Sequence, residues 1–201
     1  MSNQDLVEQI LDDHKEMRAF IDKIQQTCPS QPEEATKWLH QLVWEVARHS
    51  VAEELILYPL METELGAVGK NLADSSRADH QRTKDDLQFL ENKTLADPAA
   101  VARYRQMADE LIVHLKKEED EDLTQVRLNV GQDKLLQAGK EFKRTKFFAP
   151  TRPHPENSMD PRFETPYSLL VAPLDKLRDL FRSFPDRDLV EKVEAEATGH
   201  S

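Results

Sequence analysis

The amino-acid sequence predicts an all-α protein: an antiparallel up-down-up-down four-helix bundle followed by a C-terminal helical extension. Two observations predict this class. Apolar residues recur every three or four positions along four segments, and short connections separate those segments. The composition agrees, because 32% charged residues and only five glycines in 201 suit solvated helices better than a turn-rich barrel. We expect the bundle to occupy residues 1–130 and the extension to occupy residues 131–201.

Each of the four helices is predicted from one apolar stripe. The stripes run from Leu6 to Ile24, from Ala35 to Leu60, from Leu72 to Leu90 and from Ala100 to Glu118. Pro59 is expected to kink or end the second helix. Asp97 followed by Pro98 resembles an N-cap with proline at the first helical position, so the fourth helix should begin there.

The two halves of the bundle repeat one another. Shifting the first stripe by 66 residues places His14 on His80, with Asp13 on Asp79 before them. Shifting the second stripe by 65 residues aligns the segments HSVAEE (residues 49–54) and HLKKEE (residues 114–119). Self-similarity at a fixed offset indicates a repeated supersecondary unit, here a helical hairpin. Two such hairpins predict a bundle with a pseudo-twofold axis.

Six polar residues fall on positions that the periodicity assigns to the interior. A buried glutamate is costly unless it is paired or bound to a metal, and histidine and carboxylate bind the same ions. Distances along the helices, at about 1.5 Å per residue, place all six at one level of the bundle. We therefore expect two equivalent half-sites for two metal ions, with the two glutamates between them: His14, His49, Glu53, His80, His114 and Glu118.

These motifs resemble the hemerythrin-like family of cation-binding proteins. The resemblance rests on DH at 13–14, HSVAEELILYP at 49–59, DH at 79–80 and HLKKEE at 114–119. It implies a non-haem di-iron centre that reacts with dioxygen. Carried over by position, His14 and His49 would bind one iron, His80 and His114 the other, and Glu53 and Glu118 would bridge them.

One position departs from the oxygen-carrying members of that family, which have a further histidine one turn after the one on the third helix. Here that position is Lys84, so one iron should keep an open or water-filled site. Lys84 either extends away to solvent or places its ammonium near the cluster. Glu45 and Glu110 are interpreted as acceptors for imidazole N–H groups, as alternative ligands, or as part of an exposed face. Glu54 and Glu119 are expected on a solvated face.

Other metal sites fit the sequence less well. Ferritin-like di-iron proteins use Glu-x-x-His pairs, whereas this chain has His-x-x-x-Glu, and the zinc protease signature His-Glu-x-x-His is absent. The single cysteine, Cys28, excludes a cysteine-based zinc or iron–sulfur site. Histidine and carboxylate together suit iron, with manganese or zinc as weaker alternatives.

Charge and hydropathy bound the partners. The net charge of −11 disfavours nucleic acid and anionic membrane as partners, and no stretch approaches the roughly 20 apolar residues of a membrane span. The first residues carry no secretion signal, so we expect a soluble, cytoplasmic monomer or homodimer. No nucleotide, flavin or nicotinamide motif is present, so any electron donor is external.

The C-terminal third is expected to hold four pieces. A basic helix spans about residues 131–147, a proline-rich extended segment spans 150–166, a short amphipathic helix spans 167–181, and the last residues, EKVEAEATGHS, form a disordered tail. The basic helix is interpreted as packing on the acidic bundle, with docking of an acidic partner as the alternative.

Three functions stay open at this level. The first is a di-iron protein that binds and activates dioxygen or peroxide by oxidoreductase chemistry, either alone or together with a small-molecule substrate. The second is a non-catalytic sensor, carrier or buffer for O2, nitric oxide or iron. The third is a structural bundle without metal. The sequence names no substrate, because this scaffold hosts several functions.

Overall fold

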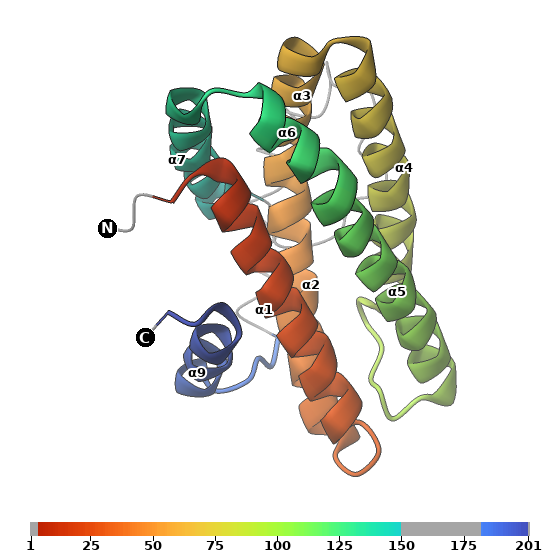
Figure 1. Ribbon diagram of the computed structural model, residues 1–201. Coiled ribbons are helices and arrows are strands. Elements are labelled where there is room, and N and C mark those ends of the chain that lie inside the picture. Colours follow the sequence, from red (N-terminus) through yellow and green to blue (C-terminus); the bar gives the residue numbers. More distant parts are fainter. Residues whose placement is uncertain (1–3, 150–181, 201) are drawn as a thin grey trace.

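The computed structural model describes residues 4–149 and 182–200 (Figure 1). Within these residues all regular secondary structure is helical, which confirms the all-α class. The four predicted helices are present as four long helices: α1 (Leu6–Thr27), α2 (Pro32–Ala52), α4 (Ala67–Leu90) and α5 (Pro98–Lys117). The expected proline-rich segment 150–166 and amphipathic helix 167–181 lie outside the described residues.

The long helices pack as two pairs. Helix α1 packs against α2, and α4 packs against α5, while contacts of α1 with α5 and of α2 with α4 join the pairs. Figure 1 shows that the chain reverses direction between the two helices of each pair. Each pair is therefore a helical hairpin, the unit that the internal repeat predicts.

Local sequence fixes where two of these helices begin. Asp5 and Glu8 form a reciprocal capping box at the start of α1, in which each side chain accepts from the other residue's backbone N–H. The predicted N-cap of α5 is confirmed, because Asp97 accepts a hydrogen bond from the backbone N–H of Ala99 and Pro98 is the first helical residue.

The helical run does not end at Pro59, although its regular α-helical pattern is interrupted just before this residue. A π-helical turn, η1 (Glu53–Leu57), follows α2 directly, and the helix continues as α3 (Tyr58–Leu65). Proline cannot donate to the carbonyl four residues before it, and the wider turn removes the need for that bond. A second π-helical turn, η2 (Glu118–Asp122), follows α5 and leads into α6 (Leu123–Asn129), although no proline stands there.

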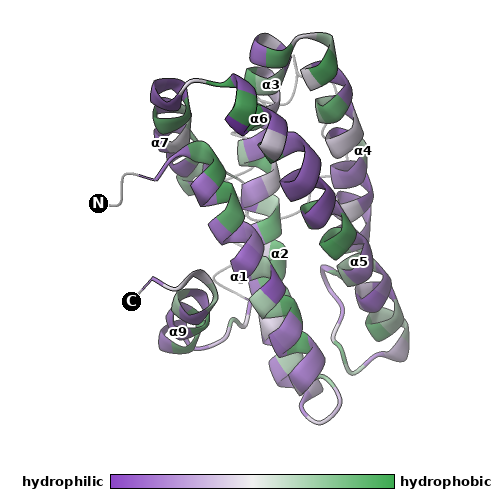
Figure 2. Cartoon of the chain, in the orientation of Figure 1, coloured by the Kyte–Doolittle hydropathy of each residue, from purple (hydrophilic) through white to green (hydrophobic). Residues whose placement is uncertain are grey.

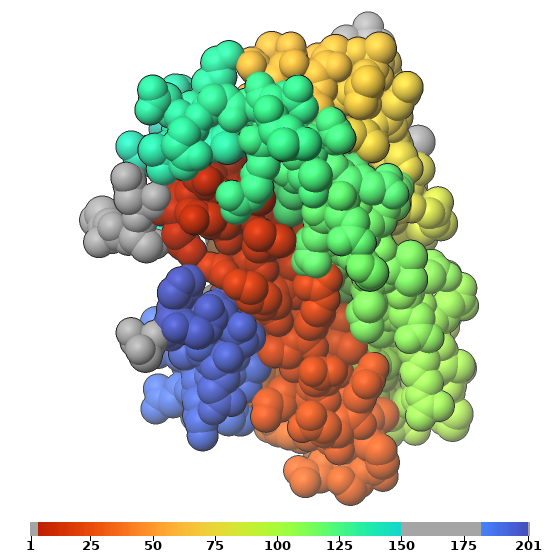
Figure 3. Space-filling model, viewed as in Figure 1, coloured from red at the N-terminus to blue at the C-terminus, as the bar shows by residue number. Residues whose placement is uncertain are grey.

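Two further helices cover the outside of the first hairpin. Helix α7 (Gln132–Phe148), the predicted basic helix, packs against α1 and α2, and α9 (Arg187–Thr198) packs along α1 (Figure 3). The expectation of a disordered tail from residue 191 onward is therefore wrong. Asp186 caps the start of α9, Gly199 ends it at φ 74°, and Val190 and Val193 are buried against the bundle.

The interior contains two apolar clusters along the bundle axis. One surrounds Phe20 and Trp38 and includes both valines of α9, and the other surrounds Tyr58 and Phe142. Along α1, α2 and α4 a histidine lies between residues of the first cluster and residues of the second. His114 lies near the end of α5, after most of its first-cluster residues and before the second-cluster residue Leu123 of α6. A polar layer thus crosses the middle of an apolar core.

Hydropathy alternates along the helices instead of forming long apolar runs (Figure 2). Among the described helices, none has both the length and the hydropathy that crossing a membrane requires.

Candidate metal centre

The structure brings the six predicted side chains together in the polar layer. The histidines come from the four long helices, and the two glutamates are the first residues of the two π-helical turns. Each of the six is at most 5% exposed: His14, His49, Glu53, His80, His114 and Glu118. π-Helical turns shift the side chains that follow them and often occur at functional sites. Because each of the two turns begins at one of these glutamates, the turns are part of the site.

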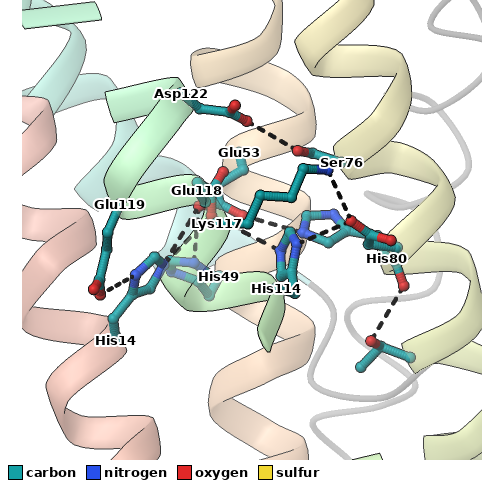
Figure 4. Close-up of polar contacts among 12 residues, drawn as sticks. His14, His49, Glu53, Ser76, His80, His114, Lys117, Glu118, Glu119 and Asp122 are labelled. Atoms are coloured by element: carbon teal, nitrogen blue, oxygen red, sulfur yellow. Dashed lines mark hydrogen bonds and ion pairs between the residues drawn. The ribbon is translucent and has the colours of Figure 1, made fainter. Parts of the chain in front are cut away.

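The glutamates lie between two pairs of histidines (Figure 4). The rings of His14 and His49 are 5.1 Å apart, and those of His80 and His114 are also 5.1 Å apart. Glu53 reaches both pairs, since its Oε1 lies 2.9 Å from His49 Nε2 and its Oε2 lies 3.3 Å from His80 Nε2. Each pair of histidines, with its nearest carboxylate oxygen, forms one half of the cluster.

Glu118 makes the complementary connection between the halves. Its Oε2 lies 3.5 Å from His14 Nε2 and 3.8 Å from His114 Nε2. Ligand atoms of His14, His49, Glu53 and Glu118 all lie within 4.8 Å of one another, which is the spacing of groups that share one ion.

The donor atoms of this cluster fit a metal. Within the described structure, His14 Nε2, His49 Nε2 and all four carboxylate oxygens of Glu53 and Glu118 are buried without a hydrogen bond of acceptable geometry. Buried polar atoms are normally satisfied, so imidazole nitrogens and carboxylate oxygens that face one another without well-formed hydrogen bonds fit a bound cation. Imidazole nitrogen and carboxylate oxygen are suitable ligands for iron, manganese and zinc.

A carboxylate stands behind each imidazole, at the Nδ1 atom that faces away from the cluster. Glu119 Oε1 lies 2.9 Å from His14 Nδ1, and Glu54 Oε1 lies 3.1 Å from His80 Nδ1. Asp13 Oδ2 lies 2.8 Å from His49 Nδ1, and Asp79 Oδ2 lies 3.5 Å from His114 Nδ1. Such partners fix the ring orientation and leave Nε2 as the nitrogen that faces an ion.

A cation in turn balances each of these carboxylates. Two of the four carboxylate–cation pairs follow the pseudo-twofold repeat, because Arg18 and Lys84 occupy equivalent positions under the 66-residue shift. The shortest N–O distances are 2.7, 2.8, 2.6 and 3.4 Å for Arg18–Glu119, Lys84–Glu54, Lys146–Asp13 and Lys117–Asp79. Because the outer carboxylates are paired with cations, Glu53 and Glu118 supply the negative charge that attracts metal ions.

The same contacts shift the pKa values of the imidazoles. Burial alone would lower the pKa of His49, but the carboxylates of Glu53 and Asp13 outweigh burial and raise it to about 10. Burial likewise opposes and Glu53 and Glu54 raise the pKa of His80, to about 9. Protons thus occupy these imidazoles in the metal-free protein, and a metal ion must displace them.

The expectation for Glu54 and Glu119 is wrong. Glu54 is 6% exposed and binds His80 and Lys84, while the partly exposed Glu119 is held by His14 and Arg18. The sequence carried a signal for this role, since both glutamates directly follow the central ones in the repeated EE pair. The residue that follows a buried ligand can contact an imidazole of another helix only if that helix lies close. The sequence pattern alone does not show how close the helices lie.

Glu45 and Glu110 have other partners instead. Glu45 is buried and paired with Lys146 and Arg48, and the exposed Glu110 accepts a hydrogen bond from Gln106. Asp13, Glu54 and Glu119 form hydrogen bonds with Nδ1 of His49, His80 and His14, whereas Asp79 lies 3.5 Å from Nδ1 of His114 without a hydrogen bond of acceptable geometry. Lys84 neither extends freely to solvent nor enters the cluster, because Glu54 holds its ammonium at 2.8 Å.

Two buried oxygen-bearing side chains lie near the cluster, and the sequence pattern did not predict them there. The Tyr58 hydroxyl lies 3.1 Å from His80 Nε2, and burial together with the surrounding carboxylates raises the pKa of Tyr58 well above its ordinary value. Asp122 accepts a hydrogen bond from Ser76 at 2.9 Å, and burial and the Glu118 charge raise the pKa of Asp122 to about 7. Tyr58 directly follows the first π-helical turn, and Asp122 is the last residue of the second.

A cleft of about 450 Å³ lies beside His114 between α4 and α5. Asp79, Arg82, Thr83, Lys117 and His114 line it, so it reaches from the protein surface to one imidazole of the cluster.

The fold and the site define a helical cation-binding protein with a buried histidine–carboxylate centre. The chain belongs to the hemerythrin-like family, since the model of the hemerythrin HHE cation binding domain matches residues 5–126. It is 34% identical over 176 residues to an uncharacterized hemerythrin-like protein of Schizosaccharomyces pombe, covering 88% of this chain and 86% of that protein.

A second relative is longer than this chain. A DNA nickase of Nostoc sp. is 23% identical over 146 residues, which are 73% of this chain but 39% of the nickase. No solved structure matches the chain.

Proposed function

We propose that this protein is a non-haem di-iron protein that binds and activates dioxygen or peroxide. One observation carries the proposal: six buried metal-ligating atoms of the histidine–glutamate cluster face one another across its centre without a hydrogen bond of acceptable geometry. His14 and His49 would hold one iron, His80 and His114 the other, and Glu53 and Glu118 would bridge them. Bound iron would supply the redox chemistry, and the protein supplies the rest.

The chain's own residues have three tasks in this proposal. The outer carboxylates orient the imidazoles, and their cations hold those carboxylates in place. The two apolar clusters above and below the polar layer exclude water from it. The cleft beside His114 admits a small molecule to the half-site that lacks a further histidine, where Lys84 is bound to Glu54.

The frame and setting belong to the same proposal. We infer an up-down-up-down bundle within residues 1–130, with residues 131–201 as an extension. The protein would act in the cytoplasm as a monomer or homodimer, with an external electron donor and without a nucleic acid or membrane partner. The net charge of −11 supports the last point, so the activity of the Nostoc nickase is not carried over.

The alternative is a non-catalytic sensor, carrier or buffer for O2, nitric oxide or iron. The sequence favours it in one respect, because it has no flavin or nicotinamide motif that would supply electrons for turnover. A stable, reversible oxygen adduct without consumption of peroxide or substrate would favour this alternative.

The test is reconstitution of the full chain with ferrous iron under anaerobic conditions, followed by elemental analysis. Two irons per chain, and a new near-ultraviolet or visible absorption band on exposure to O2 or H2O2, are expected. The double variant His49→Ala, His114→Ala should lose both. Failure of the wild-type chain to retain iron would refute the proposal, and retention of zinc or manganese alone would change the metal.

A further inference from the structure

Helix α7 lies outside the family domain of residues 5–126, yet it covers one half of the proposed metal centre. It packs against α1, α2 and η1, the elements that carry His14, His49 and Glu53 (Figure 1). The ring of its fully buried Phe142 lies 5.9 Å from the ring of His49, at an interplanar angle of 82°. The extension therefore forms one wall of the His14–His49 half.

Near its C-terminal end, α7 places a buried cation behind His49. The Lys146 side chain is 13% exposed, and its ammonium nitrogen lies 2.6 Å from Asp13 Oδ2. The same carboxylate oxygen lies 2.8 Å from His49 Nδ1. One oxygen atom is therefore held between an ammonium group and the ring nitrogen that faces away from the cluster. Charge-assisted contacts of this kind fix the orientation of a ligating imidazole.

The position of Lys146 is itself fixed by α2. Arg48, the residue before His49, donates a hydrogen bond from Nε to the carbonyl oxygen of Lys146 at 2.9 Å. Glu45, one turn earlier on α2, accepts a hydrogen bond from the Lys146 ammonium. Lys146 is thus held from two helices, and its ammonium is kept at the Asp13 carboxylate.

The support of the other half-site is looser in the described structure. Asp79 is the equivalent of Asp13, but its Oδ2 lies 3.5 Å from His114 Nδ1, without a hydrogen bond of acceptable geometry. Its cation, Lys117, lies 3.4 Å away and is 31% exposed. Both residues and His114 line the cleft of about 450 Å³. The centre therefore has one half closed by a buried ion pair and one half beside a cleft.

We propose that Lys146 is a positioning residue of the His14–His49 half-site, a role that rests on the proposed metal function. Through Asp13 it holds the His49 imidazole with Nε2 toward the centre, where an ion would bind. Without the ammonium, the Asp13 carboxylate loses one of the groups that hold it and can turn away from the ring. The ion of the His14–His49 half should then be held less tightly, whereas the ion of the other half should be unaffected.

The test compares the full-length wild type with Lys146→Met and Lys143→Met. Methionine removes the charge and keeps most of the length of the side chain, and Lys143 is the matched control because it is exposed on the same helix. Lys146→Met leaves two buried carboxylates without their shared ammonium. The double variant Lys146→Met, Glu45→Gln removes one charge of each sign and so protects the fold, with Glu45→Gln alone as its control. Urea denaturation of the metal-free proteins verifies folding.

Two readouts separate positioning from a merely structural ion pair. Anaerobic competition for ferrous iron against a chelator of known affinity measures how tightly each of the two ions is held. In zinc-loaded protein labelled with ¹⁵N-histidine, the Nδ1–H proton resonance of each imidazole reports its own hydrogen bond, because a close carboxylate moves this resonance downfield.

Lys146→Met and the double variant should lose about 10-fold in affinity for one ion and keep the affinity for the other. Their His49 resonance should move upfield, while those of His80 and His114 stay in place. Both controls should match the wild type.

Unchanged affinity, an unchanged His49 resonance, or equal weakening of both ions overturns the positioning role, and the metal function stands if the wild type holds two ions. Failure of both Lys146 variants to fold also overturns it, because the residue is then structural. Wild-type protein that binds neither iron nor zinc overturns the metal function and the positioning role with it.

Discussion

His14 Nδ1 lies 2.9 Å from Glu119 Oε1, so the first long helix is joined directly to the π-helical turn that follows the fourth. Arg18 holds the same carboxylate oxygen at 2.7 Å. The contact between Glu54 and His80 repeats this arrangement in the other hairpin, with Lys84 in the place of Arg18. The internal repeat of the sequence thus includes the supports of the imidazoles as well as the imidazoles themselves.

Replacing Glu119 by glutamine should weaken metal binding. The variant keeps the shape of the side chain but removes the charge that orients and polarises the His14 imidazole. Loss of such a partner typically lowers metal affinity 10- to 100-fold, which corresponds to about 1–3 kcal/mol of binding free energy. Competition against a chelator of known affinity measures the loss. Glu110→Gln is the control, because Glu110 is exposed and bonded to Gln106. Equal affinities for both variants would contradict the assigned role.

Metal removal should lower the stability of the protein. Ions that bind the folded state alone stabilise it by about 2.7 kcal/mol per site at a free concentration of 100 times the dissociation constant. Thermal unfolding of the loaded chain should therefore shift downward after chelation. The double variant His49→Ala, His114→Ala should unfold at one temperature with or without iron. A wild-type midpoint that is indifferent to metal would count against a site formed on folding.

Gly139→Ala should destabilise the docking of α7 on α1. A Cβ atom at Gly139 would lie 2.9 Å from both the Asp5 carbonyl carbon and the Leu6 nitrogen, which are backbone atoms that cannot move aside cheaply. Overpacking of this kind costs about 1–3 kcal/mol. Chemical denaturation measures it, and Gly131→Ala is the control, since nothing lies within 4 Å of a Cβ there. Equal midpoints for the two variants would show that α7 is not tightly packed at this position.

Glu194 on α9 should make stability depend on pH. Burial and the nearby Glu45 carboxylate raise the pKa of Glu194 from 4.5 to about 7. Between these values the folded protein keeps a proton that the unfolded chain has lost, so this group's contribution to stability falls as the pH rises through the window. Because Glu194 is only half-buried, screening limits the effect to about 1 kcal/mol.

The variant Glu194→Gln removes this dependence. Measured by urea denaturation, it should be more stable than the wild type at about pH 8 and should lose this advantage as the pH falls below the window. Glu196→Gln, an exposed change on the same helix, should show no such crossover. A constant difference between Glu194→Gln and wild type at every pH would refute the assignment.

Much of the frame follows from periodicity alone. The residue spacing predicted the four long helices, and the Asp97–Pro98 signal located the start of α5. The prediction failed in the tail, and the periodicity does not show the π-helical turn that begins at Glu53. Helix α9 is stable because Val190 and Val193 are buried in a cluster that the bundle provides.

The sequence by itself determined which residues can meet at the centre, because helical spacing and the repeat place four histidines and two glutamates at one level. Only the tertiary structure decided their surroundings. His14 and Glu119 are 105 residues apart, and Asp13 and Lys146 belong to different helices, so no local pattern pairs them. Helical periodicity is a property of neighbours along the chain, whereas the supports of each imidazole, and the hydroxyl of Tyr58 beside His80, depend on how closely separate helices pack.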